Sequence, residues 1–567
     1  MKRTLCLMVA VIILFAGGIP RAGAQGKASN QAQAYIYAIE AQMLRMEGVN
    51  PRKLIPLYQR ILPILPSPQL YIDYAHALLQ TGDLKRALQI LEEGYVRFPR
   101  NSRIPLLLGE IYANIGRQDQ AAAYLKEAIK RDPDNPLLYQ KLAEVYLSNK
   151  NYQAAFKLFE EWEKKAPPSA RLYIYWGKGY MAIGLYKQAL EKLKKALEFD
   201  PENQEILQYM AMVYQITGKE KKAIETYRKL LELNPTSLEI TDRLGRLYFR
   251  EGKKEKALRL YQNLLKIHPG HPQLVGRVVT ILASMGKKKE ALDTVNRAIK
   301  INPKSEDLIL LKGALLEDEG KRRQALDLYL DYLKKNPDKP SIYVEAARLY
   351  WRMGKKDRAF ELLRKGIIHV PDSPEIYHAL SVLYREEGEK EKALVNAAYA
   401  VVLKPKDPQL LFSLGALLER QGRWRKGAEY LKKALQLSPG NPSILNYLGY
   451  MYIDRGKKVK EGIALVREAL KKQPRNPYYL DSLAWGLFKL GKVKEALKIQ
   501  KKALKYVNKP NPIILGHMAA IYKALGMTRK AREYYKKALA HLDYKELAPW
   551  EREEIISGAK SVGLSYP

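Results

Sequence analysis

Cysteine is nearly absent from this chain of 567 residues, whose one cysteine is Cys6. A disulfide framework and a cysteine-ligated zinc site are therefore excluded. Histidine is also scarce. Only His268 and His271 are close neighbours, in a Pro269-Gly270 turn with no third ligand nearby. We interpret this pair as structural turn residues and expect no metal site.

Long apolar runs are missing as well, except near the N-terminus. Leu5–Ala16 is apolar, follows two basic residues and precedes the small residues Ala22-Gly23-Ala24. This order is typical of a signal peptide, and the run is short for a bilayer span. Cys6 lacks the small-residue context of a lipoprotein cleavage site. We therefore predict cleavage after Ala24, with an uncleaved anchor as the alternative because Arg21 lies close to the cleavage site.

This prediction places residues 1–24 in a signal peptide and the mature chain in the periplasm or cell envelope. It expects no transmembrane helix in the mature chain.

Acidic residues are few beside basic ones, with 60 Asp and Glu against 98 Lys and Arg and a formal net charge of +38. Removal of the predicted signal peptide leaves a formal net charge of about +35 on the mature chain. Such a charge favours anionic partners, namely acidic proteins, anionic lipid, acidic polysaccharide or nucleic acid. Export makes nucleic acid an unexpected partner.

Proline, alanine and glycine recur at a fixed interval of 34 residues over most of the chain. The alanines run from Ala87 to Ala393, and the glycines run from Gly82 to Gly422 with Lys150 in place of one of them. The prolines are Pro99, Pro133, Pro167, Pro201, Pro235, Pro269, Pro303, Pro337, Pro371, Pro405 and Pro439. A fixed period of this length indicates stacked supersecondary units that cannot bury their apolar faces alone.

One unit, residues 170–201, is typical. Tyr173, Trp176 and Tyr180 follow helical spacing, and Gly184 supplies the left-handed conformation that ends a helix. A second helix with Ala189 on its inner face follows, and Asp200-Pro201 ends it. We therefore predict a helical hairpin for each unit.

The offsets of the aromatic, Leu-Gly, Tyr, Ala and Pro positions resemble those of the tetratricopeptide repeat. About fourteen units fit between residues 68 and 543. The resemblance implies an all-α, right-handed superhelix, an α-solenoid whose first helices line a concave groove that binds protein segments. It implies no chemistry of its own.

The two ends differ from the repeats. We interpret residues 25–67 as a degenerate N-terminal capping repeat, with a docking segment as the alternative, because end units of solenoids have one face in water. Residues 544–567 include a helix start at Pro549, followed by acids, which we predict to be a C-terminal capping helix. We expect no catalytic domain in these short ends and no enzyme, because phosphate-loop, nucleophile-elbow and zinc-protease motifs are absent.

Basic residues cluster in the turns between the two helices of each unit from Gly218 onward. Since these turns recur once per unit, their charges are expected along one edge of the solenoid. One reading is a solvated edge that limits aggregation; the other is an anion-binding ridge. The ridge would comprise Lys253, Lys254, Lys287, Lys288, Lys321, Arg322 and Arg323.

The period lengthens by one residue between Pro439 and Pro474, and again before Pro512. The sequence here resembles a two-unit signature of bacterial envelope tetratricopeptide repeat proteins, with Ala484 where glycine is more usual. That resemblance places seven side chains on the groove, either as partner-binding anchors or as packing between first helices. They are Asn446, Tyr450, Ile453, Tyr478, Asp481, Trp485 and Phe488.

Two functions follow from these patterns. The first is an exported scaffold or adaptor, without catalysis or cofactor, that gathers protein partners in assembly or processing at the bacterial envelope. The alternative is an anion-binding module for polysaccharide or lipid-surface assembly that works through the basic edge.

Overall fold

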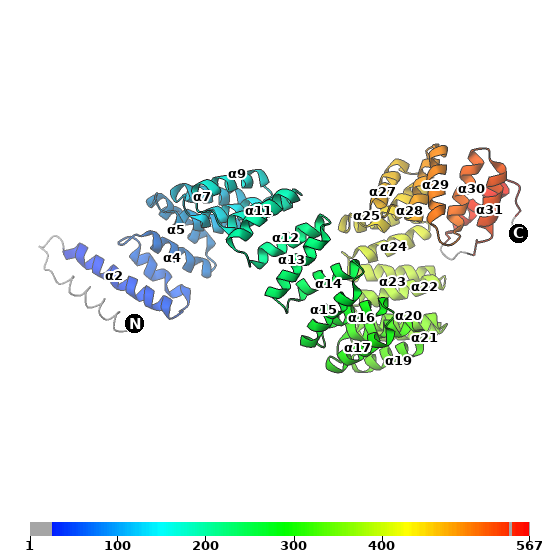
Figure 1. The fold of residues 1–567 in the computed structure, drawn as a ribbon, viewed down its shortest axis with the longest axis horizontal. Helices are drawn as coiled ribbons and strands as arrows, with labels where there is room; N and C mark the ends of the chain where they lie inside the picture. The colour runs from blue at the N-terminus through cyan, green and yellow to red at the C-terminus, as the bar shows by residue number, and fades with distance from the viewer. Residues whose placement is uncertain (1–24, 544–546, 566–567) are drawn as a thin grey trace. The chain divides into compact units, whose positions relative to one another are not determined.

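The computed structural model describes residues 25–543 and 547–565, and within these ranges the secondary structure is helical without strands. The predicted signal peptide lies outside the described residues. The chain falls into two compact units, divided between Ile267 and His268 (Figure 1). The all-α prediction is confirmed.

The first unit begins with a long helix and a short irregular segment and continues with regular pairs of helices. Its elements are α2 (Gln25–Met46), the 3-10 helix η1 (Pro51–Lys53), α3 (Ile55–Ile61), α4 (Pro68–Gln80), α5 (Leu84–Arg97), α6 (Arg103–Asn114), α7 (Gln118–Arg131), α8 (Pro136–Ser148), α9 (Tyr152–Lys165), α10 (Ala170–Ala182), α11 (Tyr186–Phe199), α12 (Gln204–Ile216), α13 (Glu220–Leu233), α14 (Leu238–Arg250) and α15 (Lys254–Ile267).

The second unit continues the regular pairs and ends with a single helix. Its elements are α16 (Pro272–Ser284), α17 (Lys288–Ile301), α18 (Glu306–Asp318), α19 (Arg322–Lys335), α20 (Pro340–Arg352), α21 (Lys356–His369), α22 (Pro374–Glu386), α23 (Lys390–Leu403), α24 (Pro408–Arg420), α25 (Trp424–Leu437), α26 (Pro442–Asp454), α27 (Val459–Lys472), α28 (Pro477–Lys489), α29 (Val493–Tyr506), α30 (Pro512–Ala524), α31 (Thr528–Leu539) and α32 (Pro549–Lys560).

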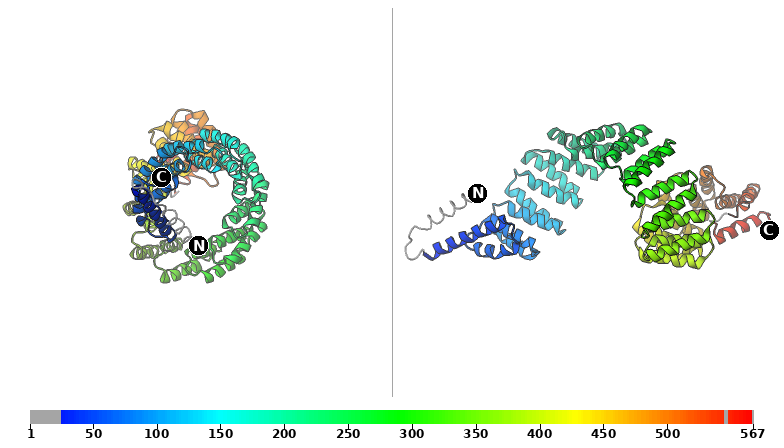
Figure 2. Two further views of the ribbon diagram at one scale, coloured as in Figure 1. Left: turned by 90° about the vertical axis from the view of Figure 1, so that its left-hand side faces the viewer. Right: turned by 90° about the horizontal axis from the view of Figure 1, so that it is seen from below.

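The helices α4 to α31 form about fourteen successive hairpins, as the sequence predicts. In each hairpin the even-numbered helix is the first and packs against the odd-numbered second helix. Each hairpin also contacts the next, so the pairs stack in chain order within each unit (Figure 2).

The predicted hairpin of residues 170–201 forms as α10 and α11. Gly184 lies between them with a φ of +78°, the left-handed conformation that glycine adopts without a steric penalty. A Cβ on Gly177 would lie 2.9 Å from Leu193 Cγ, so the small residue lets the two helices approach closely. Ala189 and Ala196 are fully buried on the second helix. The small-residue ladders therefore set the distance between paired helices.

Among the residues that the structure describes, two turns adopt the left-handed conformation without glycine at that position. Lys150 replaces a glycine of the ladder and has a φ of +56°, and Lys458 has the same φ at the first lengthening of the period. A residue with a Cβ is strained there. The fold therefore imposes the turn even where the sequence does not favour it.

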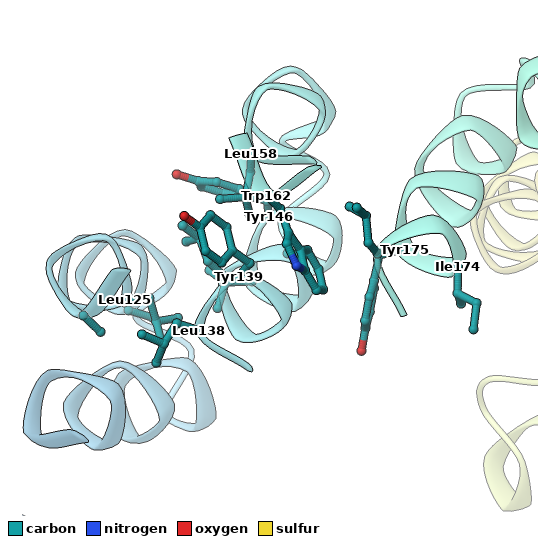
Figure 3. Packing of buried hydrophobic residues seen from close by; sticks show 14 of the residues in the cluster. Leu125, Leu138, Tyr139, Tyr146, Leu158, Trp162, Ile174 and Tyr175 are labelled. Atoms are coloured by element: carbon teal, nitrogen blue, oxygen red, sulfur yellow. The ribbon is translucent and has the colours of Figure 1, made fainter. Parts of the chain in front are cut away.

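Large aromatic side chains fill the core of the first unit. Tyr139 and Trp162 are fully buried and stacked, with ring centroids 5.8 Å apart. Leu138 and Leu158 belong to the same continuous cluster (Figure 3). Burial of such apolar area is the main favourable contribution to folding.

The segment before the repeats packs onto α4. Tyr58 of α3 and Tyr74 of α4 have ring centroids 5.9 Å apart, and Arg45 of α2 pairs with Asp73 of α4 at 2.8 Å. These contacts are compatible with the predicted N-terminal cap, which stays a prediction.

Candidate functional site

The first helices of the last three hairpins, α26, α28 and α30, begin in the same way. Asn441, Asn476 and Asn511 each precede a proline, and each side-chain oxygen accepts hydrogen bonds from two backbone N–H groups in the first turn. Such caps satisfy N–H groups that have no partner within a helix.

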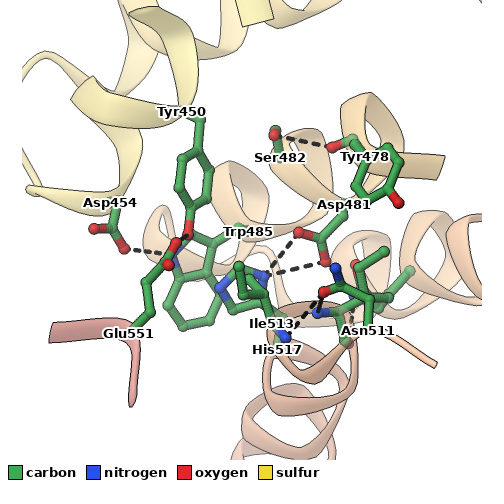
Figure 4. Close-up of polar contacts among 12 residues, drawn as sticks. Tyr450, Asp454, Tyr478, Asp481, Ser482, Trp485, Asn511, Ile513, His517 and Glu551 are labelled. Carbon is green, nitrogen blue, oxygen red and sulfur yellow. Dashed lines mark hydrogen bonds and ion pairs between the residues drawn. The ribbon is translucent and has the colours of Figure 1, made fainter. Parts of the chain in front are cut away.

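Trp485 of α28 lies at the centre of an aromatic cluster. Its ring stacks with the rings of His517 and Phe488, with centroids 4.0 Å and 4.9 Å away. Tyr450 of α26 lies near the same imidazole, with ring centroids 6.3 Å apart. The cluster therefore joins first helices of three successive hairpins, as Figure 4 shows.

Asp481 of α28 forms a buried polar network with residues from two other helices. Its carboxylate accepts a hydrogen bond of 2.5 Å from Gln500 Nε2 of α29 and lies 3.0 Å from Nδ1 of His517. Gln500 also donates to the carbonyl oxygen of Ile514 at 2.9 Å. Burial opposes protonation of His517, but the charge and hydrogen bond of Asp481 outweigh it and raise the pKa of the imidazole.

The seven predicted groove residues differ in their surroundings. Trp485 is 2% exposed, and Ile453 and Asp481 are also buried, as expected from the packing interpretation. Tyr478 is 50% exposed and does not join the cluster. Asn446 is half-buried, and its Oδ1 is enclosed without a hydrogen-bond partner in the part of the chain that the structure describes. The sequence places these residues on neighbouring first helices, but they do not form one open aromatic strip.

The reason is that the first turn of α32 lies against α26 and α28. Tyr450 donates a 2.8 Å hydrogen bond to Glu551 Oε1, although the two residues are 101 positions apart. Trp550 Nε1 donates to Asp454 Oδ2 at 3.0 Å, and Trp485 Nε1 donates to Asp454 Oδ1 at 3.4 Å. Asp454 therefore accepts hydrogen bonds from two indoles.

Charged residues surround this contact. The Arg455 guanidinium lies 4.0 Å from the centroid of the Trp550 ring and pairs with Glu419 of α24 at 3.2 Å. Desolvation raises the pKa of the Glu419 carboxyl, and it also raises the pKa of Glu551. Hydrogen bonds from Ala548 and Tyr450 to Glu551 only partly offset its burial.

The sequence patterns predict no role for Asp454, Arg455, His517, Trp550 or Glu551. Asp454 and Arg455 lie at the end of the first helix of a repeat, where charged residues are common and carry no motif. Trp550 lies outside the repeats, so the period gives no position for it. The one signal was a tryptophan at a helix start in a chain with six tryptophans.

The predicted basic edge is partly neutralised by nearby acids. Lys253 pairs with Glu251 at 2.7 Å and Lys321 pairs with Glu319 at 2.8 Å. Lys287 pairs with Glu290 at 3.1 Å, and Lys288 pairs with Asp318 at 2.5 Å. Arg322 and Arg323 are exposed. These local pairs favour a solvated edge over an anion-binding ridge.

A second candidate surface lies on α20, α22 and α24. A groove of about 400 Å³ has an apolar floor formed mainly by these first helices. The apolar residues are Val344, Ala347, Ala379, Val382, Leu383 and Leu410, and the polar ones include Arg348, Glu375, His378, Lys404 and Asp407. We call this surface the middle groove.

The described ranges, 25–543 and 547–565, hold neither a candidate metal site nor a candidate membrane-spanning helix. No group of three or more His, Cys, Asp or Glu side chains there is placed to hold a metal ion. None of the helices there has the length and apolarity needed to cross a membrane.

Comparison with known families agrees with the helical hairpins. Three family models, each described as tetratricopeptide repeat, match this chain. The matched residues are 73–136, 116–173, 180–241, 248–315, 316–383 and 404–544. The chain belongs to the tetratricopeptide repeat family, whose members are in general protein-interaction scaffolds.

Solved structures with similar helices share little sequence with the chain. The APC/C hetero-tetramer Cut9–Hcn1 is 16% identical over 82% of this chain and 96% of that chain, with a TM-score of 0.39. Naa15/Naa10 bound to HypK-THB is 16% identical over 94% of this chain and 87% of that chain, with a TM-score of 0.36. The type IV pilus biogenesis factor PilW is 22% identical over 38% of this chain and 97% of that chain, with a TM-score of 0.33.

All three TM-scores are low, so these structures carry no argument about what this chain binds. No curated protein matches the sequence.

Proposed function

We propose that the chain is a non-enzymatic scaffold, exported to the bacterial cell envelope, that holds segments of partner proteins against its first helices. Its family supports the protein-binding part, since stacked hairpins present extended surfaces that partners use. The pattern of residues 1–24 supports export.

The middle groove is the observation that carries the proposed binding. Its charged and polar residues already have partners: Arg348 pairs with Glu317 at 2.6 Å, and Lys404 pairs with Asp407 at 3.0 Å. His378 lies 3.0 Å from Ser413 Oγ. Satisfied polar groups around an apolar floor favour a ligand with apolar side chains, such as an amphipathic helix or an extended segment.

Photo-crosslinking in the native host tests this function. A benzophenone amino acid replaces Val382 in the groove, and the matched control carries it at the exposed Lys365 on the second helix α21. We expect a discrete adduct from position 382 alone. The corresponding purified partner segment should bind about tenfold more weakly to a Val382→Asp chain. Equal adducts at both positions, or none, would contradict the proposal.

Export has a separate test. The mass of the protein from its host should correspond to a chain that begins at Gln25. An intact Met1 in the cytoplasmic fraction would contradict the envelope location and leave the groove proposal in place.

A further inference from the structure

The helix α32 makes two distinct sets of contacts. Its middle and end cover the last hairpin, where Ile555 packs with Leu515 of α30 and Ala559 packs with Tyr535 of α31. Gly516 permits the close approach, since a Cβ there would lie 2.9 Å from Ile555 Cγ1. These contacts suffice to cover the end of a solenoid.

The first turn of α32 makes the other set of contacts, and it does so on earlier hairpins. Trp550 and Glu551 bond to Asp454 and Tyr450 across 96 and 101 residues. A helix that only covers α30 and α31 does not require contacts with α26. We call the contacted surface the α26–α28 site, and its residues are Tyr450, Asp454, Arg455 and Trp485.

The chemistry of the α26–α28 site is specific. Asp454 accepts from an indole N–H, Arg455 lies over the indole face, and the Tyr450 hydroxyl donates to a side-chain oxygen. Glu551 also accepts a 2.8 Å hydrogen bond from the backbone N–H of Ala548, which is the reciprocal bond of a capping box. The site therefore receives the start of a helix with Trp at its second position and Glu at its third.

The carboxylate of Glu551 is the unfavourable part of this contact. It is buried beside Asp454, and Glu419 also lies nearby. Arg455 pairs with Glu419, and the imidazole of His517 lies against Asp481. A glutamine at the same helix position would accept the bond from Ala548 through its Oε1 and donate a hydrogen bond from its Nε2 to the Tyr450 hydroxyl oxygen, without burying a negative charge. The chain's own helix is thus a usable but suboptimal occupant.

We propose that the α26–α28 site recognises the start of a helix in a partner protein, with tryptophan at its second position and glutamine or protonated glutamate at its third. The chain's own α32 fills the site until that partner displaces its first turn. This inference rests on the proposed scaffold function, because it assigns a partner to one part of the same row of first helices.

The tether explains why the displacement needs a well-matched partner. A segment attached to the chain competes at a high effective concentration, in the millimolar range for a short link. A peptide added to the wild-type chain therefore binds weakly, and the site becomes measurable when the attached tryptophan is removed.

The test uses the full chain with Trp550→Ala and a fluorescent peptide with the sequence of residues 548–560. We expect the variant to bind this peptide about tenfold more tightly than the wild-type chain does. A peptide with Gln in place of Glu551 should bind at least as tightly at neutral pH. A peptide with Ala in place of Trp550 should lose about tenfold in affinity.

Three further chains keep the test decisive. A Trp550→Phe chain keeps an aromatic ring for packing but lacks the N–H that Asp454 accepts, so it should also gain peptide binding. A Glu553→Ala chain changes an exposed residue of the same helix and should behave as wild type. Adding Asp454→Ala to the Trp550→Ala chain should abolish the gain. Thermal unfolding verifies that each chain is folded.

Three outcomes would overturn the inference. The first is equal binding of the Trp and Ala peptides, and the second is no peptide binding to either folded Trp550 variant. The third is a wild-type dimer that the Trp550→Ala substitution dissociates, because copies of the chain would then exchange α32. The crosslinked adducts expected from position 382 in the middle groove do not depend on any of these outcomes. Failure of this inference is therefore distinguishable from failure of the scaffold function.

Discussion

Trp485 is enclosed by the side chains around it, with two stacked rings and Lys489 Nζ at 4.4 Å from its ring centroid. Trp485→Ala should lower the free energy of unfolding by about 3–5 kcal/mol, because it removes a large buried side chain and leaves a cavity. Denaturant unfolding measures this change. Tyr478→Ala, at a half-exposed position on the same helix, is the matched control and should cost far less; equal losses would contradict the packing.

Lys150 offers a residue-scale test of the turns. Lys150→Gly should raise the stability of the first unit by about 1 kcal/mol, because the left-handed conformation is strained for a residue with a Cβ. Lys150→Ala keeps that strain and is the control. A decrease in unfolding free energy for the glycine variant would show that chain entropy outweighs the strain.

Protonation should strengthen the contact between α32 and α26. The groups that face Glu551 are Tyr450, Asp454 and His517, and the pKa values of Glu551 and His517 are both raised in the docked state. A raised pKa contributes stability that is present below the undocked value and is lost as pH rises through the docked value.

We therefore expect the protection of α32 from hydrogen exchange, corrected for the intrinsic rate, to fall as pH rises above the ordinary range of glutamate. Glu551→Gln should remove that part of the pH dependence which belongs to the carboxyl. Identical pH dependence in the two chains would contradict the assignment.

At the scale of single helices, α23 carries apolar side chains on its exposed face, as α5 does with Val96 and α21 with Ile368. The outward positions of α23 carry Val395, which is 65% exposed, and Val402, which is 71% exposed. The matching positions of α25 are Glu429 and Gln436. Val395→Glu with Val402→Gln should change the free energy of unfolding by less than about 0.5 kcal/mol per site, because these side chains bury little area. A larger loss in denaturant unfolding would show that the outer face supports the fold.

The helices differ in how far the sequence predicts them. The 34-residue period fixes hairpins such as α10 and α11, because glycine and proline act locally on the backbone and small residues set the packing distance. The docking of α32 was not predictable in this way. It depends on side chains about 100 residues apart, and the same sequence pattern fits a cap that touches only α30 and α31.

The same limit applies to the candidate site. Periodicity correctly places Tyr450 and Trp485 on successive first helices, and it predicts that Asp481 shares a helix face with Trp485. It does not tell whether that face is open, because the covering residues Trp550 and Glu551 follow no repeat. The burial of these side chains is known only from the three-dimensional arrangement. The choice between packing and partner binding therefore could not be made from the sequence.

At the scale of the whole chain, the net charge of +38 does not by itself define a binding surface. Lysines of the predicted edge have acidic neighbours, whereas the C-terminal site gathers the carboxyl groups of Glu419, Asp454, Asp481 and Glu551 near Arg455 and His517. Because the site already holds several acidic side chains, the first turn of a nearly neutral helix is the ligand that complements it best.

The central claim is that α32 and a partner helix compete for one site, and a reversible lock tests it directly. Lys489 of α28, whose Nζ also lies over the Trp485 ring, forms an ion pair with Glu554 of α32 at 3.6 Å. A chain with Lys489→Cys, Glu554→Cys and Cys6→Ser has these two cysteines alone. A short, reducible bis-maleimide linker should join them within one chain.

The peptide of residues 548–560, with Gln in place of Glu551, then reports on the site. The account predicts that the linked chain binds this peptide about tenfold more weakly than the same chain after reductive cleavage of the linker. Equal affinity of the linked and cleaved chains would contradict it.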